Sequence, residues 1–123
     1  MRETRLATLL GPYMGEDVAE GRYYGACVVN APGGWTRVGP TWKVRGGWIV
    51  VGPGVRAWNT TKGLAELAVE KTAKPDWHAV GATFIENPYL VIPATPEASA
   101  NSPEVRGLTT EAEAMESEKA KES

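Results

Sequence analysis

The side chains that build most metal and nucleophilic sites are scarce in this sequence. Its 123 residues include one cysteine, Cys27, and one histidine, His78. Cys27 cannot form an intramolecular disulfide, and its apolar neighbours predict a buried thiol in a reducing compartment. No zinc-ligand or nucleophile spacing surrounds either residue, so we expect no catalytic residue, no metal site and no cofactor. An enzyme with His78 as general base remains an alternative.

Long hydrophobic runs are also absent. No apolar segment approaches the roughly 18 to 20 residues that cross a bilayer, and the run at residues 6–10 is too short for the core of a secretory signal. We therefore expect a soluble cytoplasmic protein with no membrane partner.

Negative charge is concentrated only in the last part of the sequence. Residues 107–123 hold five glutamates and two lysines, a net charge of −3, so the remaining residues carry about +1 of the total of −2. Extended nucleic acid usually requires a concentrated basic surface, which this near-neutral body lacks. One small phosphorylated ligand remains compatible with it.

Glycine and proline divide much of the chain into short β-type runs, which predicts a meander of antiparallel strands. Two later runs, residues 78–85 and 89–92, flank Glu86-Asn-Pro88 and predict a closing hairpin. The earlier turns are expected at residues 31–34, 39–40, 45–47 and 52–54, and the strands that they separate at 23–30, 35–38, 41–44, 48–51 and 55–58.

One segment has helical periodicity. Leu64, Leu67 and Ala68 follow the i, i+3, i+4 spacing of an apolar helix face, which predicts a helix over about residues 61–72. A second helix start at 95–97 is interrupted by Ser102-Pro103, so residues 95–106 should form a short helix or a loop.

The sequence therefore predicts an α+β fold, a small antiparallel sheet with one helix packed on it. The predicted parts are an N-terminal arm at residues 1–21 with one helical turn or a strand, a β-rich core at 22–94, the short helix or loop at 95–106, and an acidic tail at 107–123. The tail has few large apolar residues, and we expect an exposed fraying helix or disorder there.

The junction between the predicted strand at 55–58 and the predicted helix is the candidate binding site. Free N–H groups at a helix N-terminus favour anions, and an arginine beside them can bind a phosphate in bidentate fashion. Capping and packing of an ordinary fold element explain the same residues equally simply. The candidate ligand-binding residues are Arg56, Trp58, Asn59, Thr60, Thr61 and Lys62.

Tryptophan is abundant for so small a chain, with five residues: Trp35, Trp42, Trp48, Trp58 and Trp77. Aromatic faces near Arg or Lys can stack a nucleobase, whereas the alternative is a core or an interface built from large rings. Short strands with open edges are commonly covered by a second copy, so we expect a homo-oligomer.

Three short motifs follow one another between residues 55 and 93: Val55-Arg-Ala-Trp58, Gly63-Leu-Ala-Glu-Leu-Ala-Val-Glu70 and Tyr89-Leu-Val-Ile-Pro93. In these motifs, and over about seventy residues from residue 23 onward, the chain resembles a family of small uncharacterised proteins encoded by tailed phages and prophages. The resemblance supplies no catalytic residues.

The resemblance implies the biological setting in which the protein acts. Small phage proteins outside the virion commonly act by binding, so we expect a non-enzymatic accessory protein of the host cytoplasm, serving counter-defence by holding a small phosphorylated or nucleotide-like ligand. The alternatives are a protein-binding inhibitor of a host protein and a minor virion or assembly component.

Overall fold

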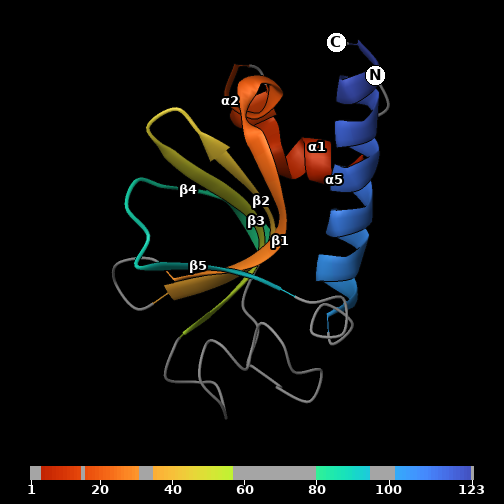
Figure 1. Ribbon diagram of the computed structural model, residues 1–123. Coiled ribbons are helices and arrows are strands. Elements are labelled where there is room, and N and C mark those ends of the chain that lie inside the picture. Colours follow the sequence, from red (N-terminus) through yellow and green to blue (C-terminus); the bar gives the residue numbers. More distant parts are fainter. Residues whose placement is uncertain (1–3, 15, 31–34, 57–79, 95–101, 123) are drawn as a thin grey trace.

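The computed structural model describes residues 4–14, 16–30, 35–56, 80–94 and 102–122, and these residues form an α+β fold (Figure 1). The predicted fold class and the antiparallel sheet are confirmed. The N-terminal arm is helical. The elements are α1 (Arg5–Leu10), η1 (Gly11–Met14), α2 (Glu16–Glu20), β1 (Arg22–Asn30), β2 (Trp35–Val44), β3 (Gly47–Arg56), β4 (Val80–Ile85), β5 (Leu90–Pro93) and α5 (Pro103–Glu122). The helix predicted at 61–72 lies outside the described residues.

The first four strands form a meander whose hairpins only partly follow the predicted turns. The antiparallel pairing of β1 with β2 and the tight turn at residues 45–47 between β2 and β3 are confirmed, whereas the turn expected at 31–34 lies outside the described residues. The expected breaks at 39–40 and 52–54 are wrong, because β2 and β3 each continue through them.

Gly39 and Gly52 explain why these positions do not end a strand. A Cβ atom on Gly39 would overlap the carbonyl oxygen of Val51, and one on Gly52 would overlap that of Val38. The two backbones therefore approach more closely than any pair of residues with side chains allows. The glycines mark a shared bend within the hairpin, and not a reversal of the chain.

The predicted closing hairpin is also wrong. The strand order is β4-β3-β2-β1-β5, so β4 and β5 lie at opposite edges of the sheet, and β5 pairs with β1. The local turn at residues 86–89 links them, but each strand finds its partner elsewhere.

That topology requires a curled sheet. Ile85 pairs with Trp48 at one corner of the sheet, and Leu90 pairs with Asn30 at the opposite corner. In a flat sheet these corners would be about 30 Å apart, from four strand spacings and eight residues along β1. The five residue steps from Ile85 to Leu90 span at most about 18 Å. The sheet therefore curls until its two edge strands come within reach of a short connection (Figure 1).

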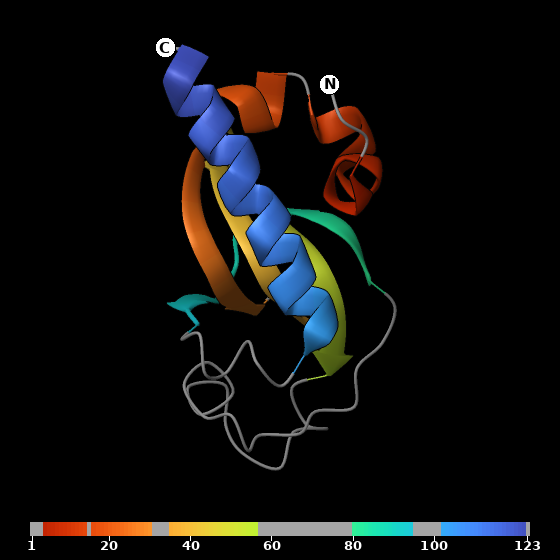
Figure 2. The same ribbon diagram turned by 90° about the vertical axis from the view of Figure 1, so that its right-hand side faces the viewer.

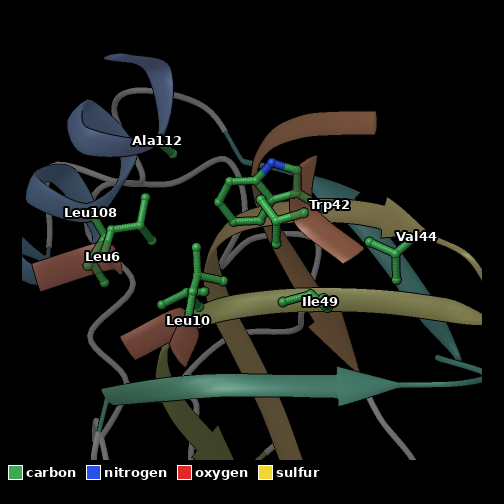
Figure 3. Close-up of a cluster of buried hydrophobic side chains, with 9 residues drawn as sticks. Leu6, Leu10, Trp42, Val44, Ile49, Leu108 and Ala112 are labelled. Atoms are coloured by element: carbon green, nitrogen blue, oxygen red, sulfur yellow. The ribbon is translucent and has the colours of Figure 1, made fainter. Parts of the chain in front are cut away.

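The curled sheet has two apolar sides. The inner side joins buried side chains of β1, β3 and β4, among them Cys27, Val50 and Ile85, with Val91 of β5 packed against them. On the outer side, α1 and α5 cover the sheet (Figure 2). Trp42 lies fully buried there among leucines from both helices (Figure 3). The predicted burial of the Cys27 thiol is confirmed.

Helix α5 corrects the interpretation of the acidic tail. Pro103 occupies the first position of the helix, where its missing N–H has no cost, and the Ser102 hydroxyl accepts a hydrogen bond from the Val105 N–H at 3.3 Å. Ser102-Pro103 therefore starts a helix, whereas residues 95–101, where a short helix or a loop was expected, lie outside the described residues. Val105, Leu108 and Ala112 are buried against the sheet, so this helix has one covered face, while the expected weak order of residues 107–123 stays a prediction. The sequence did not reveal this buried helix face, because Ala112 is small and Val105 lies before residue 107, outside the segment that was interpreted as the tail.

One carboxylate of α5 caps the first helix of the chain. The two oxygens of Glu111 accept hydrogen bonds from the N–H groups of Arg5 and Leu6, both at 3.1 Å. Thr4 caps Ala7 at 3.0 Å, and Arg5 pairs with Glu104. Three N–H groups that an isolated helix would leave without partners are thus bound, and α1 is fixed to α5.

We expect Gly39→Ala to lower the free energy of unfolding by about 3 kcal/mol or more, because the added methyl group forces β2 and β3 apart at their bend. Urea denaturation followed by circular dichroism measures the change. Gly81→Ala in β4 is the matched control, since a Cβ there meets nothing within 4 Å. Equal stability of the two variants would contradict the bend.

We expect Glu111→Gln to cost about 1 to 2 kcal/mol of unfolding free energy, because a neutral amide offers the two α1 N–H groups only one oxygen. Thermal denaturation of this variant should be compared with that of Glu118→Gln, which changes an exposed glutamate of the same helix. A loss of similar size in the control would show that only the charge of α5 matters.

Candidate functional site

The predicted strand-to-helix site is described only at its first residue. The backbone of Arg56 ends β3, where it pairs with Trp35. The Arg56 side chain, together with Trp58, Asn59, Thr60, Thr61 and Lys62, lies outside the described residues, so the convergence of these groups stays a prediction.

Two of the five tryptophans have described side chains, and they differ in role. Trp42 is fully buried, and its indole N–H donates to a carboxylate oxygen of Glu116 at 3.2 Å, so it is a core residue. Trp48 is half-buried and lies on the opposite side of the sheet. Trp35, Trp58 and Trp77 lie beyond the part of the chain for which side chains are described.

Trp48 belongs to a row on β1, β2 and β3 in which two adjacent rings lie between two cations. The ring of Tyr24 meets that of Trp48 edge to face, with centroids 5.0 Å apart. The Arg22 guanidinium lies 5.3 Å from the Tyr24 ring centre, and the Lys43 ammonium lies 5.5 Å from that of Trp48. These contacts hold Tyr24 in place although 41% of its surface remains exposed.

A cavity of about 420 Å³ opens between β1 and α5 beside Tyr24. It is apolar on the strand side and polar on the helix side. Its lining residues are Tyr24, Gly25, Ala26, Pro93, Ala94, Arg106, Thr109, Thr110 and Glu113.

A bulge in β1 shapes the strand side of this cavity. Gly25 has a φ of 80°, which other residues rarely adopt, and the register with β2 shifts between Tyr23 and Ala26. Strand β5 pairs with β1 only from Cys27 onward, and the Ala94 N–H closes the pairing on the Ala26 carbonyl at 2.8 Å. The first half of β1 therefore has no β5 beside it, and the cavity lies at that step.

The helix side is a single polar stripe of α5. Arg106, Thr109, Thr110 and Glu113 follow the i, i+3, i+4, i+7 spacing that places residues on one helix face. The Thr109 hydroxyl donates to the Val105 carbonyl at 2.7 Å, and that of Thr110 to the Arg106 carbonyl at 3.0 Å. Because their protons are donated within the helix, both hydroxyl oxygens are left as acceptors at the cavity.

Sequence reasoning missed these four residues, since the segment was assigned to a loop and an exposed tail. Their helical spacing was visible in the sequence. What the sequence lacked was any sign that this helix face meets the bulge of β1.

Behind the stripe, Tyr23 is wedged between the sheet and α5. Its ring centroid is 5.1 Å from that of Trp42, and its hydroxyl is buried with no hydrogen-bond partner among the described residues. Burial, reinforced by the charges of Glu113 and Glu116, raises the pKa of Tyr23 well above its usual value. Burial likewise raises the pKa of the Cys27 thiol, which disfavours the reactive thiolate.

Among the described residues, no helix is long and apolar enough to cross a membrane, and no group of three or more His, Cys, Asp or Glu residues is placed to hold a metal ion. Comparisons with protein-family models, with curated proteins and with solved structures found no match.

We expect the stability of the protein to fall as the pH rises above about 10, because the unfolded chain then releases the Tyr23 proton while the folded chain retains it. Tyr23→Phe should make this decline shallower. At neutral pH the variant should be as stable as the parent or more so, since a buried hydroxyl without a partner is removed. Urea denaturation across about pH 7 to 11 measures both effects.

Tyr89→Phe provides the control, because Tyr89 is 68% exposed and the change removes a phenol hydroxyl from the surface and not from the core. An unchanged alkaline decline in Tyr23→Phe would assign that decline to other groups.

Proposed function

We propose that this protein is a non-enzymatic binding protein that holds a small phosphorylated or nucleotide-like ligand in the cavity between β1 and α5. The observation that carries the proposal is the convergence of a guanidinium, two acceptor hydroxyls, a carboxylate and an aromatic ring on one cavity. Its volume of about 420 Å³ lies within the range of small-molecule sites, roughly 300 to 1,000 Å³.

The chemistry of the lining favours a ligand that is anionic at one end and carries hydroxyl groups. Arg106 is exposed on α5 and can grip a phosphate with two parallel N–H bonds. The hydroxyl oxygens of Thr109 and Thr110 can accept from the hydroxyl groups of a sugar. Tyr24, Pro93 and Ala94 supply apolar contact for a flat ring.

The proposed context is counter-defence by a phage protein in the host cytoplasm, and it rests on the family resemblance. A protein that sequesters a signal acts by stoichiometric binding and needs no catalytic group. In this proposal the protein is a homo-oligomer, and Arg56 and residues 58–62 remain a second candidate place for the same ligand.

We expect one or more members of a panel of mono-, di- and cyclic nucleotides and ADP-ribose derivatives to raise the melting temperature. At a hundred times its dissociation constant a ligand stabilises the fold by about 2.7 kcal/mol, a shift on the order of 10 °C for a domain of this size. Tryptophan fluorescence gives a second readout, because Trp48 contacts Tyr24 at the cavity.

Three arginine variants show where on the protein the ligand binds. Arg106→Ala should abolish the shift, whereas Arg45→Ala, in the exposed turn between β2 and β3, should leave it unchanged. Loss in Arg56→Ala instead would move the site to the strand-to-helix junction. A panel with no shift would refute the proposal and favour the inhibitor of a host protein, while detection of the chain in purified particles by mass spectrometry would favour a virion component.

A further inference from the structure

The order of the polar groups along α5 narrows the class of ligand. We infer that the cavity selects guanine nucleotides, with the phosphate at Arg106 and the hydrogen-bonding edge of the base at Glu113; this inference rests on the proposed binding function. From one end of the stripe to the other, the protein offers a cationic donor, then two neutral acceptors, then an anionic acceptor. A complementary ligand is therefore an anion, then hydroxyl groups, then N–H donors.

The length of the stripe matches such a ligand. Arg106 and Glu113 are seven residues apart, which is about 10.5 Å along a helix axis. That separation is comparable with the length of a nucleoside 5′-monophosphate from its phosphate to the far edge of its base. The two threonines lie between these ends, where the ribose hydroxyls would be.

Three glutamates of this helix are held by ion pairs or hydrogen bonds, whereas among the described side chains Glu113 and the exposed Glu118 are not, and of these two only Glu113 lines the cavity. Among the described residues, Glu104 pairs with Arg5, Glu111 caps α1, and Glu116 accepts from Trp42 and pairs with Lys119 at 3.1 Å. Within the described part of the chain, Glu113 makes neither an ion pair with a basic side chain nor a hydrogen bond with an N–H group, and it lines the cavity.

A carboxylate at this position discriminates among the bases. Guanine presents two adjacent donors, the N1–H and the 2-amino group, which bind the two oxygens of a carboxylate in parallel. Adenine and cytosine place a ring-nitrogen acceptor beside their amino group, and uracil has one N–H between two carbonyl groups. Each of these arrangements sets an acceptor against the carboxylate and leaves at most one hydrogen bond.

Isothermal titration calorimetry of the full chain with GMP, IMP, AMP, CMP and UMP tests the inference. We expect GMP to bind at least about tenfold more tightly than AMP, CMP or UMP, and IMP, which keeps N1–H but lacks the 2-amino group, to fall between them. In Glu113→Gln the advantage of GMP over AMP should disappear, while AMP binds as before or better. Glu118→Gln, an exposed change on the same helix, should preserve the parent order.

The outcomes separate this inference from the function on which it rests. Similar affinities for all five nucleotides, lost in Arg106→Ala, would overturn guanine selection and leave the binding function in place. A GMP preference that survives Glu113→Gln would overturn the role of Glu113. Absence of binding by every nucleotide tested would overturn both proposals. The comparison of GMP with IMP uses the parent protein and does not depend on the folding of a variant.

Discussion

The close approach of the backbones at Gly39 and Gly52 is the constraint on which the rest of this structure depends. It lets the hairpin of β2 and β3 bend, and the bend curls the sheet until the edge strands β4 and β5 can be joined by a four-residue connection. The curl also encloses the inner apolar cluster around Cys27. Because β5 reaches β1 from that side and stops at Ala26, the first half of β1 is left beside α5 with space for a cavity.

The parts of the fold that sequence reasoning predicted are those determined by neighbouring residues. The turn at Arg45-Gly-Gly47 and the strand β1 follow from local turn chemistry and strand propensity. The partner of β5 and the bend at Gly39 depend on residues elsewhere in the sheet, so the same glycine and proline signals were interpreted as breaks. Helix α5 was hidden for a similar reason, since its buried face is short and its capping of α1 joins residues 106 positions apart.

The residues of the candidate site also differ in whether sequence reasoning could find them. The sequence directed attention to Arg56 and residues 58–62, because a strand-to-helix junction is a recognisable anion site. The cavity described by the structure uses Arg106 and Glu113, whose residue types are ordinary on any solvated helix. They gain significance only from the bulge at Gly25, which α5 crosses. A sequence pattern can show that four polar residues share a helix face, but it does not show which strand that face meets.

The bond between Glu111 and the start of α1 also has a consequence for how the chain is completed during translation. Helices α1 and α2 are too short to persist in water alone, and the carboxylate that caps α1 lies 106 residues further along the chain than Arg5. Lys119 binds the carbonyl groups of Val18 and Gly21 from even later in the sequence. Residues of α1 therefore dock on a helix that is synthesised about a hundred residues later, and until then the apolar surfaces of Leu6 and Leu10 have no cover from α5.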